Sequence, residues 1–438
     1  MRISYENAAS VWAINLGFWA YNVRALSELL RAIRRNEVDG DSAADTQRNR
    51  RVRSDSTTEI HVIARREFLK ASAYASAGCV LAGAAFLPGQ PNPKSVTGRG
   101  SLKAHAHRHG LLAGCAVAPA ILRDEPTYGA VLAEQYSLMV ATSAMKFGRL
   151  SPKPGVYNFD DADSLLAFAT EHQIRMRGHN FIWHEQLPPW FAGTVTRDNA
   201  RKILTDHILT VGGHYRGKMH SWDVVNEALN LPDEQPNGLR KTPWYELIGP
   251  DYLDLAFKTA RQADPEAKLT YNEYGIEYDN EASDKKRAAT LDLLRGFKQR
   301  GVPIDALGIQ SHIFATYPSS FGRGIREVIA AAAEMGLEIY ITGLDVNDDG
   351  LDSDDFTSRD HTVAQVYRNY LDCILENKAV KAILTWGITD RHTWLDTFLR
   401  DKKKHPNRPE RCLPFDPAYN PTEAFFAIQE AFDHAPKR

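Results

Sequence analysis

The stretch SWDVVNEAL at 221–229 is apolar in its middle and ends in a polar pair, Asn226 and Glu227. It predicts a buried β-strand with a carboxylate just past its C-terminal end. In barrel enzymes, this end of a buried parallel strand carries the catalytic groups. A glutamate there can act as a general acid or base. The competing interpretation is that the Asn-Glu pair only caps a following helix.

Other apolar runs also end in side chains that could do chemistry. The residues that share this placement are Lys146, His179, Trp183, Gln310, His312, Trp386 and Trp394. Amides and charged groups can bind sugar hydroxyls, while aromatic rings cover the apolar faces of a pyranose. A single Trp or His is more often a packed core residue. Because such residues recur at successive strand ends, the set favours a carbohydrate site.

Eight short apolar runs supply these strand ends, at residues 111–117, 137–142, 174–181, 219–225, 268–272, 306–310, 338–344 and 380–386. Amphipathic stretches lie between them, among them 161–172, 197–211, 281–300 and 361–375. Alternating strands and helices predict an α/β fold with a parallel sheet. Eight such repeats predict a closed (β/α)8 TIM barrel over residues 104–438. An open doubly wound sheet is the alternative, but no glycine-rich phosphate loop follows the first strand.

Several segments together resemble glycoside hydrolase family 10, the endo-β-1,4-xylanases. The matching segments are GHNFIWHEQLPPW at 178–190, SWDVVNEAL at 221–229, LGIQSH at 307–312, LTWGITDRHTW at 384–394 and FDPAYNPTEAF at 415–425. The resemblance implies a (β/α)8 barrel that cleaves internal β-1,4-bonds of xylan with retention of configuration. It also implies Glu227 as the acid/base and an ordering role for His312 and Gln310. The residues expected to hold the sugar are Lys146, His179, Trp183, Asn226, Gln310, Trp386 and Trp394.

The nucleophile that this family uses is missing. The resemblance places it in a Thr-Glu-Leu-Asp pattern at the end of the seventh strand, where this chain reads Thr342-Gly343-Leu344-Asp345. Retaining hydrolysis needs two carboxylates about 5–5.5 Å apart, and Gly343 provides none. Asp345 shares the face of position 343 but is displaced by about 6–7 Å along the strand. Asp345 and Glu273 are therefore only displaced candidates for the missing group.

A second departure lies after the second strand. The family's Glu-Asn pair, which binds sugar on the non-reducing side, corresponds here to Thr142 and Ser143, and a family tryptophan corresponds to Phe147. We therefore expect weaker or altered binding on that side. The two departures together favour divergence over a single error in the sequence.

Two classes of function stay open at this point. One is a xylan-degrading hydrolase that is impaired or uses a rearranged carboxylate. The other is a non-catalytic barrel that binds xylan or a related glycan. Glu227 favours the hydrolase, since a binding protein has little use for a general acid, whereas Gly343 favours the binding protein.

The first hundred residues differ in composition from the rest. Residues 41–59 are polar and charged, as in a disordered segment, so 1–64 are expected to be an extension or to precede the true start. Arg65 and Arg66 precede an uncharged run of small and apolar residues, which resembles a twin-arginine signal. A membrane anchor is the alternative. The composition of residues 65–103 therefore predicts a signal followed by a linker. We expect the protein to be exported to the periplasm or the cell exterior.

The net charge and the cysteine spacing limit which ligands and binding partners are expected. A net charge of −2 gives no indication of a nucleic-acid partner. The four cysteines show no CxxC spacing, which indicates no zinc site and leaves at most one distant disulfide. We expect no metal or organic cofactor, no membrane contact after removal of the signal, and a monomer.

One acidic segment imitates a calcium loop. Residues 345–350 copy the first half of an EF-hand loop, but its twelfth position, which requires a bidentate glutamate, is Phe356. The segment therefore predicts a solvated acidic loop. The basic run at 401–405 likewise predicts a solvated loop.

Overall fold

The computed structural model describes residues 96–438. Eight parallel strands form a closed ring, β1 (Leu112–Val117), β2 (Leu138–Ala141), β3 (Arg175–Ile182), β4 (Ser221–Asn226), β5 (Lys268–Glu273), β6 (Ala306–Ile309), β8 (Glu338–Asn347) and β9 (Val380–Thr385). The ring closes because β6 pairs with β8 and β9 pairs with β1. The predicted (β/α)8 barrel is thereby confirmed, and each predicted apolar run overlaps its strand. A further short strand, β7 (His312–Phe314), was not predicted; it follows β6 and pairs with β8.

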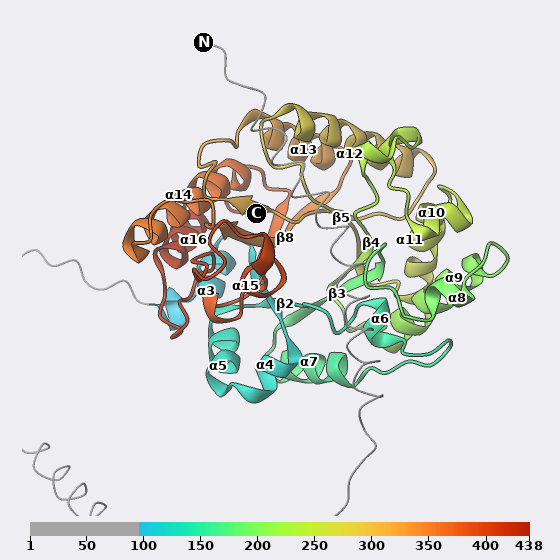
Figure 1. Ribbon diagram of the computed structural model, residues 1–438, viewed down its shortest axis with the longest axis horizontal. Helices are drawn as coiled ribbons and strands as arrows, with labels where there is room; N and C mark the ends of the chain where they lie inside the picture. The colour runs from blue at the N-terminus through green and yellow to red at the C-terminus, as the bar shows by residue number, and fades with distance from the viewer. Residues whose placement is uncertain (1–95) are drawn as a thin grey trace, which may run out of the picture. The chain divides into compact units, whose positions relative to one another are not determined.

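Helices surround the ring of strands (Figure 1). In chain order they are α3 (Leu102–Arg108), α4 (Pro119–Asp124), α5 (Pro126–Gln135), α6 (Phe147–Leu150), α7 (Asp160–Glu171), α8 (Phe191–Thr194), α9 (Ala200–His214), α10 (Pro243–Ile248), α11 (Tyr252–Ala263), α12 (Glu281–Gln299), α13 (Arg323–Glu334), α14 (Phe356–Leu375), α15 (Trp394–Phe398) and α16 (Glu423–His434). The four predicted helical stretches correspond to α7, α9, α12 and α14. Helix α14 begins earlier than predicted because Asp355 caps it, accepting a hydrogen bond from the Ser358 amide at 2.7 Å.

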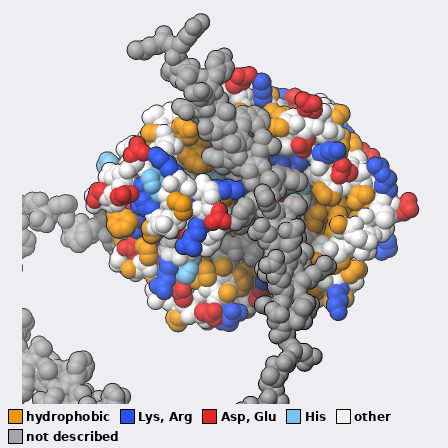
Figure 2. Space-filling view, viewed as in Figure 1, with side chains coloured by type: hydrophobic (Ala, Val, Ile, Leu, Met, Phe, Trp, Pro, Cys, Tyr) orange, Lys and Arg blue, Asp and Glu red, His pale blue; other side chains and the backbone are white. Residues whose placement is uncertain are grey.

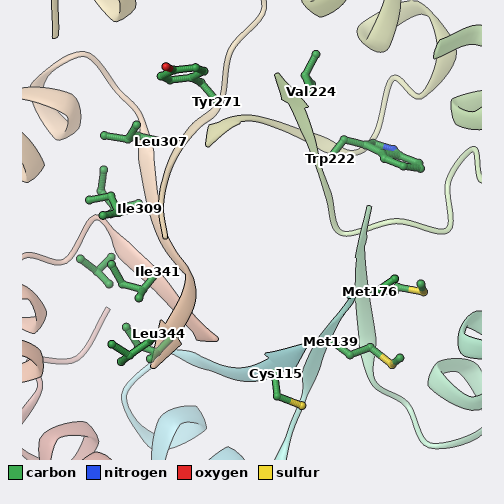
Figure 3. Close-up of a cluster of buried hydrophobic side chains, with 14 of the residues drawn as sticks. Cys115, Met139, Met176, Trp222, Val224, Tyr271, Leu307, Ile309, Ile341 and Leu344 are labelled. Carbon is green, nitrogen blue, oxygen red and sulfur yellow. The ribbon is translucent and has the colours of Figure 1, made fainter. Parts of the chain in front are cut away.

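Apolar side chains separate the sheet from its helices. Residues such as Met139, Trp222 and Leu307 point away from the barrel axis (Figure 3) and belong to the main core. A smaller cluster that includes Val140, Tyr340 and Leu384 is also buried. Because successive strand residues face opposite sides of the sheet, the remaining strand positions can carry polar groups. The barrel thus packs its outer face with apolar residues and keeps polar side chains for the strand ends.

The loops after β8 and β9 pack against each other. Asp348 is fully buried, accepts from Arg359 Nε at 2.6 Å, and donates its amide to Glu410 at 3.0 Å. Lys403 is buried against the same Glu410 carboxylate, at 3.0 Å. The prediction of a solvated acidic loop at 345–350 is therefore wrong, because most of these residues are buried. In the basic run at 401–405 only Lys403 is buried, while Asp401 and Lys404 are exposed as predicted. Among residues 96–438, no group of His, Cys, Asp or Glu is arranged to hold a metal ion.

Three of the four cysteines, Cys115, Cys373 and Cys412, are buried and free. Cys79, the predicted extension at 1–64 and most of the predicted signal and linker at 65–103 lie outside the described residues. No helix in the described part of the chain is long and apolar enough to cross a membrane. On the visible face, basic and acidic side chains are interspersed over the described surface (Figure 2).

Candidate active site

Glu227 directly follows β4 at the C-terminal end of the barrel. Its backbone lies in the left-handed region, with φ of +59°, which is uncommon for a non-glycine residue. Two hydrogen bonds fix this conformation: the Glu227 amide donates to the Asn272 carbonyl at 2.9 Å, and Arg240 Nε donates to the Glu227 carbonyl at 2.9 Å. The next turn of helix is the 3-10 segment Leu231–Asp233, with Asn230 at its N-cap. The helix-capping interpretation of Glu227 is therefore wrong.

Three of the predicted residues hold the Glu227 carboxylate. Gln310 Nε2 and Asn226 Nδ2 donate to Oε1 at 2.9 Å and 3.1 Å. Trp183 Nε1 donates to Oε2 at 2.9 Å. The side chain keeps 12% of its surface exposed. Glu227 is thus oriented by its neighbours and still open to a substrate.

The protonation of Glu227 is set by opposing effects. Burial works against its charge, but His184, Arg240 and the hydrogen bonds from Gln310 and Trp183 outweigh burial and hold its pKa below the ordinary value. Burial in turn lowers the pKa of His184 to about 3. A general acid in a retaining site needs a raised pKa, which a facing carboxylate supplies by repulsion. Without a carboxylate at position 343, Glu227 lacks this effect.

A break between β6 and β7, which both run parallel to β8, positions Gln310 and His312. Ser311, between them, has φ of +63°, and its amide donates to Glu277 at 3.0 Å. Gln310 bonds to Glu227 as described, while His312 Nδ1 lies 3.0 Å from Asp345 Oδ1. The positive φ of Ser311 therefore allows Gln310 and His312, on either side of it, to contribute to the same site.

Gly343 lies on β8 beside His312. A Cβ at this position would lie 3.2 Å from the Gln310 carbonyl oxygen and 3.3 Å from both Cε1 and Nε2 of His312. The backbone at Gly343 is outside the left-handed region, so the conformation does not demand glycine. A longer side chain fits if its neighbours shift by a few tenths of an ångström. Gly343 therefore lies in close contact with the Cε1–Nε2 edge of the imidazole.

The two displaced carboxylates are already engaged elsewhere. Glu273 is fully buried, 2.9 Å from Lys286 Nζ, and accepts from the Tyr271 hydroxyl at 2.5 Å. Asp345 uses one oxygen for His312 and the other for Trp394 Nε1, at 2.6 Å. Both carboxylates are thus held by neighbouring side chains.

Aromatic and basic side chains complete the site. The Trp386 ring packs edge-on against His179 and His312, with centroids 5.4 Å and 6.0 Å away. Trp394 lies 5.0 Å from His312. Lys146 Nζ lies 4.6 Å from the centre of the Trp183 ring. With the contacts above, all ten positions singled out from the sequence form one connected cluster.

A buried partner orients His179, and burial changes the pKa of Lys146. His179 Nδ1 lies 2.9 Å from Asp223 Oδ2, and Arg177 binds the other oxygen of Asp223. Burial lowers the pKa of Lys146 to about 8, although Glu227 and Glu185 favour its charge. Phe147, in contrast, is buried and stacks 3.8 Å from His207. Phe147 thus contributes to the core beneath this corner of the site.

Sequence reasoning missed Glu185. His184 Nε2 lies 3.8 Å from Glu185 and 4.0 Å from Glu227. Burial and the charge of Glu227 raise the pKa of Glu185 to about 7. The signal was present, since an acidic residue follows the strand-end Trp183-His184 pair directly. Its burial beside a second carboxylate was not visible from the sequence.

Glu185→Gln is expected to stabilise the fold in alkaline solution. The folded pKa of about 7 lies above the ordinary value of 4.5, so native Glu185 lowers stability as the pH rises from about 4.5 through 7. Removing the charge should increase the free energy of unfolding at pH 8 by about 1–3 kcal/mol, with little change at pH 4. Urea unfolding at both pH values measures this, with Glu171→Gln at the exposed end of α7 as control. An equal change in the free energy of unfolding at both pH values would contradict the raised pKa of Glu185.

Comparisons with known proteins identify one matching family and several relatives of similar sequence and fold. Residues 101–431 match the family described as Glycosyl hydrolase family 10. Endo-1,4-beta-xylanase B of Thermotoga neapolitana is 34% identical over 313 residues, covering 71% of this chain and 85% of the relative. A beta-1,4-xylanase of Dictyoglomus thermophilum is 34% identical over 311 residues, covering 69% and 83%. The crystal structure of xylanase 10B from Thermotoga maritima superimposes with a TM-score of 0.67 at 33% identity, covering 76% of this chain and 98% of that one.

Proposed function

The chain belongs to glycosyl hydrolase family 10, and on that premise we propose that it binds β-1,4-linked xylan and cleaves it slowly. The observation that carries the proposal is the Glu227 carboxylate, held by Asn226, Gln310 and Trp183 at the mouth of the barrel. It is supported by relatives named as xylanases.

In the proposed reaction, Glu227 protonates the glycosidic oxygen as the bond to the leaving sugar breaks. Trp386 and Trp394 cover the sugar ring, and Lys146 and His179 bind its hydroxyls. A retaining enzyme would form a covalent intermediate on a carboxylate across the ring from Glu227. Gly343 cannot do so, and turnover is accordingly low.

Titration calorimetry with three hexasaccharides tests the substrate class. Xylohexaose should bind, whereas cellohexaose and mannohexaose should bind more weakly. Trp386→Ala should reduce the affinity for xylohexaose, and Arg123→Ala on the exposed surface of α4 should not. Failure to bind xylohexaose, or equal affinity for all three sugars, would overturn the proposal.

The second candidate is a non-catalytic barrel that binds the same glycan. Gly343 is the observation that favours it, because a binding protein needs no nucleophile. The two candidates differ in whether any bond cleavage depends on Glu227. Tight binding of xylohexaose, with equal and negligible product from the native protein and from Glu227→Gln, would support the binding protein.

Small anions are expected to rescue cleavage partially. Azide or formate is expected to bind beside Gly343, where the His312 side chain is 27% exposed. On an aryl xylobioside, which needs little acid assistance, the rate should rise by about tenfold or more, equivalent to ~1.4 kcal/mol of barrier. Release of the aryl alcohol measures the rate, and mass spectrometry should detect the glycosyl azide. The same anions should not accelerate Gly343→Glu; acceleration of both proteins alike would contradict the expectation.

We also propose that the protein is exported, since xylan is too large to enter a cell. The proposal rests on Arg65 and Arg66 and the uncharged run that follows them. Replacing both arginines by lysine should retain the protein in the cytoplasm, which fractionation and immunoblotting would show.

A further inference from the structure

The His312–Asp345 pair has the construction of a catalytic base. Nδ1 of His312 lies 3.0 Å from Asp345 Oδ1, and Trp394 Nε1 fixes the other carboxylate oxygen at 2.6 Å. A carboxylate on Nδ1 favours the tautomer with the proton on that nitrogen. Nε2 of the neutral ring is then an acceptor.

This acceptor, Nε2 of His312, lies beside Gly343. Nε2 is 3.3 Å from the position that a Cβ of residue 343 would take. The His312 side chain keeps 27% of its surface exposed, so solvent water can reach the ring and lie within hydrogen-bonding distance of Nε2.

Glu227 and Gly343 lie on different sides of the barrel mouth. Glu227 follows β4 and Gly343 lies on β8, with β5 and β6 between them in the ring. An inverting glycosidase needs this kind of placement, with a general acid on one side of the sugar and a base that activates water on the other. Glu185 does not meet the requirement, because His184 links it to Glu227 on the side of the acid.

We propose that His312, oriented by Asp345, is the general base of an inverting hydrolysis in this chain. The inference rests on the proposed function and specifies its chemistry. Nε2 of His312 takes a proton from water as the water oxygen bonds to the anomeric carbon. The glycosidic bond breaks, and Glu227 gives its proton to the leaving oxygen. His312 then releases its proton to solvent and Glu227 takes one up.

The charges around His312 explain why this reaction is slow. Burial opposes the charge on His312, but Asp345, Glu277 and Glu227 together raise its pKa above the ordinary 6.5. The pKa of Glu227 lies below 4.5. The reaction requires Glu227 protonated and His312 neutral, and with these pKa values only a small fraction of molecules meets both conditions at any pH. The rate should therefore be low, with a maximum between the two pKa values.

Product stereochemistry tests the proposal. NMR of fresh xylohexaose digests should show the native protein releasing α-anomeric products, while Gly343→Glu releases β-anomeric products. His312→Gln should reduce the native rate by about 10²-fold and remove the acid limb of the pH profile, so that the remaining rate falls only as Glu227 loses its proton. His214→Gln, which removes another histidine–aspartate pair at 2.9 Å, should leave rate and product unchanged. Glu227→Gln serves as the blank for contaminating activity.

The outcomes separate this inference from the function on which it rests. Initial β-products from the native protein would overturn the inference. So would the absence of cleavage above the Glu227→Gln blank in a protein that binds xylohexaose, and so would α-products that persist undiminished in His312→Gln. The proposed function would fail differently, through absence of xylohexaose binding and absence of xylan cleavage by Gly343→Glu.

Discussion

Gly343→Glu is expected to raise the rate of xylan hydrolysis by on the order of 10³-fold or more, since removal of an enzymatic nucleophile costs at least this much. The new side chain would extend along His312, with its Cβ 3.2–3.3 Å from the nearest atoms. Its carboxylate can form the glycosyl-enzyme that the native chain cannot. Its negative charge would also raise the pKa of Glu227, so the acid should be protonated at higher pH. Reducing-sugar release across a pH series measures both effects.

Two controls separate the carboxylate from simple filling of space. Gly343→Gln has nearly the same shape without the charge, and Gly343→Ala adds only the Cβ. Both should remain near the native rate. Equal activation by glutamate and glutamine, or no activation in a folded Gly343→Glu protein, would refute the role of position 343.

Glu227→Gln is expected to have the opposite effect when placed in the Gly343→Glu protein. Losing the general acid should slow hydrolysis of xylan by about 10²–10⁴-fold. An aryl xyloside with a good leaving group should lose much less in the step that forms the intermediate, because that leaving group needs no proton. The glutamine oxygen can accept from Gln310, whereas its amide nitrogen cannot accept from Trp183, so the variant loses the Trp183 hydrogen bond and its folding is checked by circular dichroism.

Parallel kinetics on xylan and on an activated aryl xylobioside measure this difference. Glu171→Gln, at the exposed end of α7, is the matched control and should not affect either substrate. An equal loss on both substrates in burst-phase kinetics would indicate that Glu227 serves binding rather than proton transfer.

The barrel could be predicted because its signals are local. Each strand is a short apolar run, and helices such as α12 (Glu281–Gln299) show a clear amphipathic pattern. The strand β7 was missed because it depends on the backbone break at Ser311, where a positive φ is stabilised by the distant Glu277. The acidic loop at 345–350 was wrongly predicted to be solvated for a similar reason. Asp348 donates its amide to Glu410, 62 residues further along the chain.

The sequence identified candidate residues of the site but not the electrostatic interactions between them. The sequence identifies Glu227 and the missing carboxylate at Gly343, because both lie in recognisable strand-end patterns. It does not reveal that Glu185 shares the surroundings of Glu227, or that the His312 ring edge lies beside Gly343. Those relations arise between different strands, and they determine which group holds a proton.

The most direct measurement is product analysis on xylan, with the native protein and Gly343→Glu side by side at equal concentration. The native protein should release only traces of xylo-oligosaccharides, while Gly343→Glu should degrade the polymer to short oligomers. Degradation by the native protein at the rate of Gly343→Glu would contradict the central claim that glycine at position 343 limits turnover.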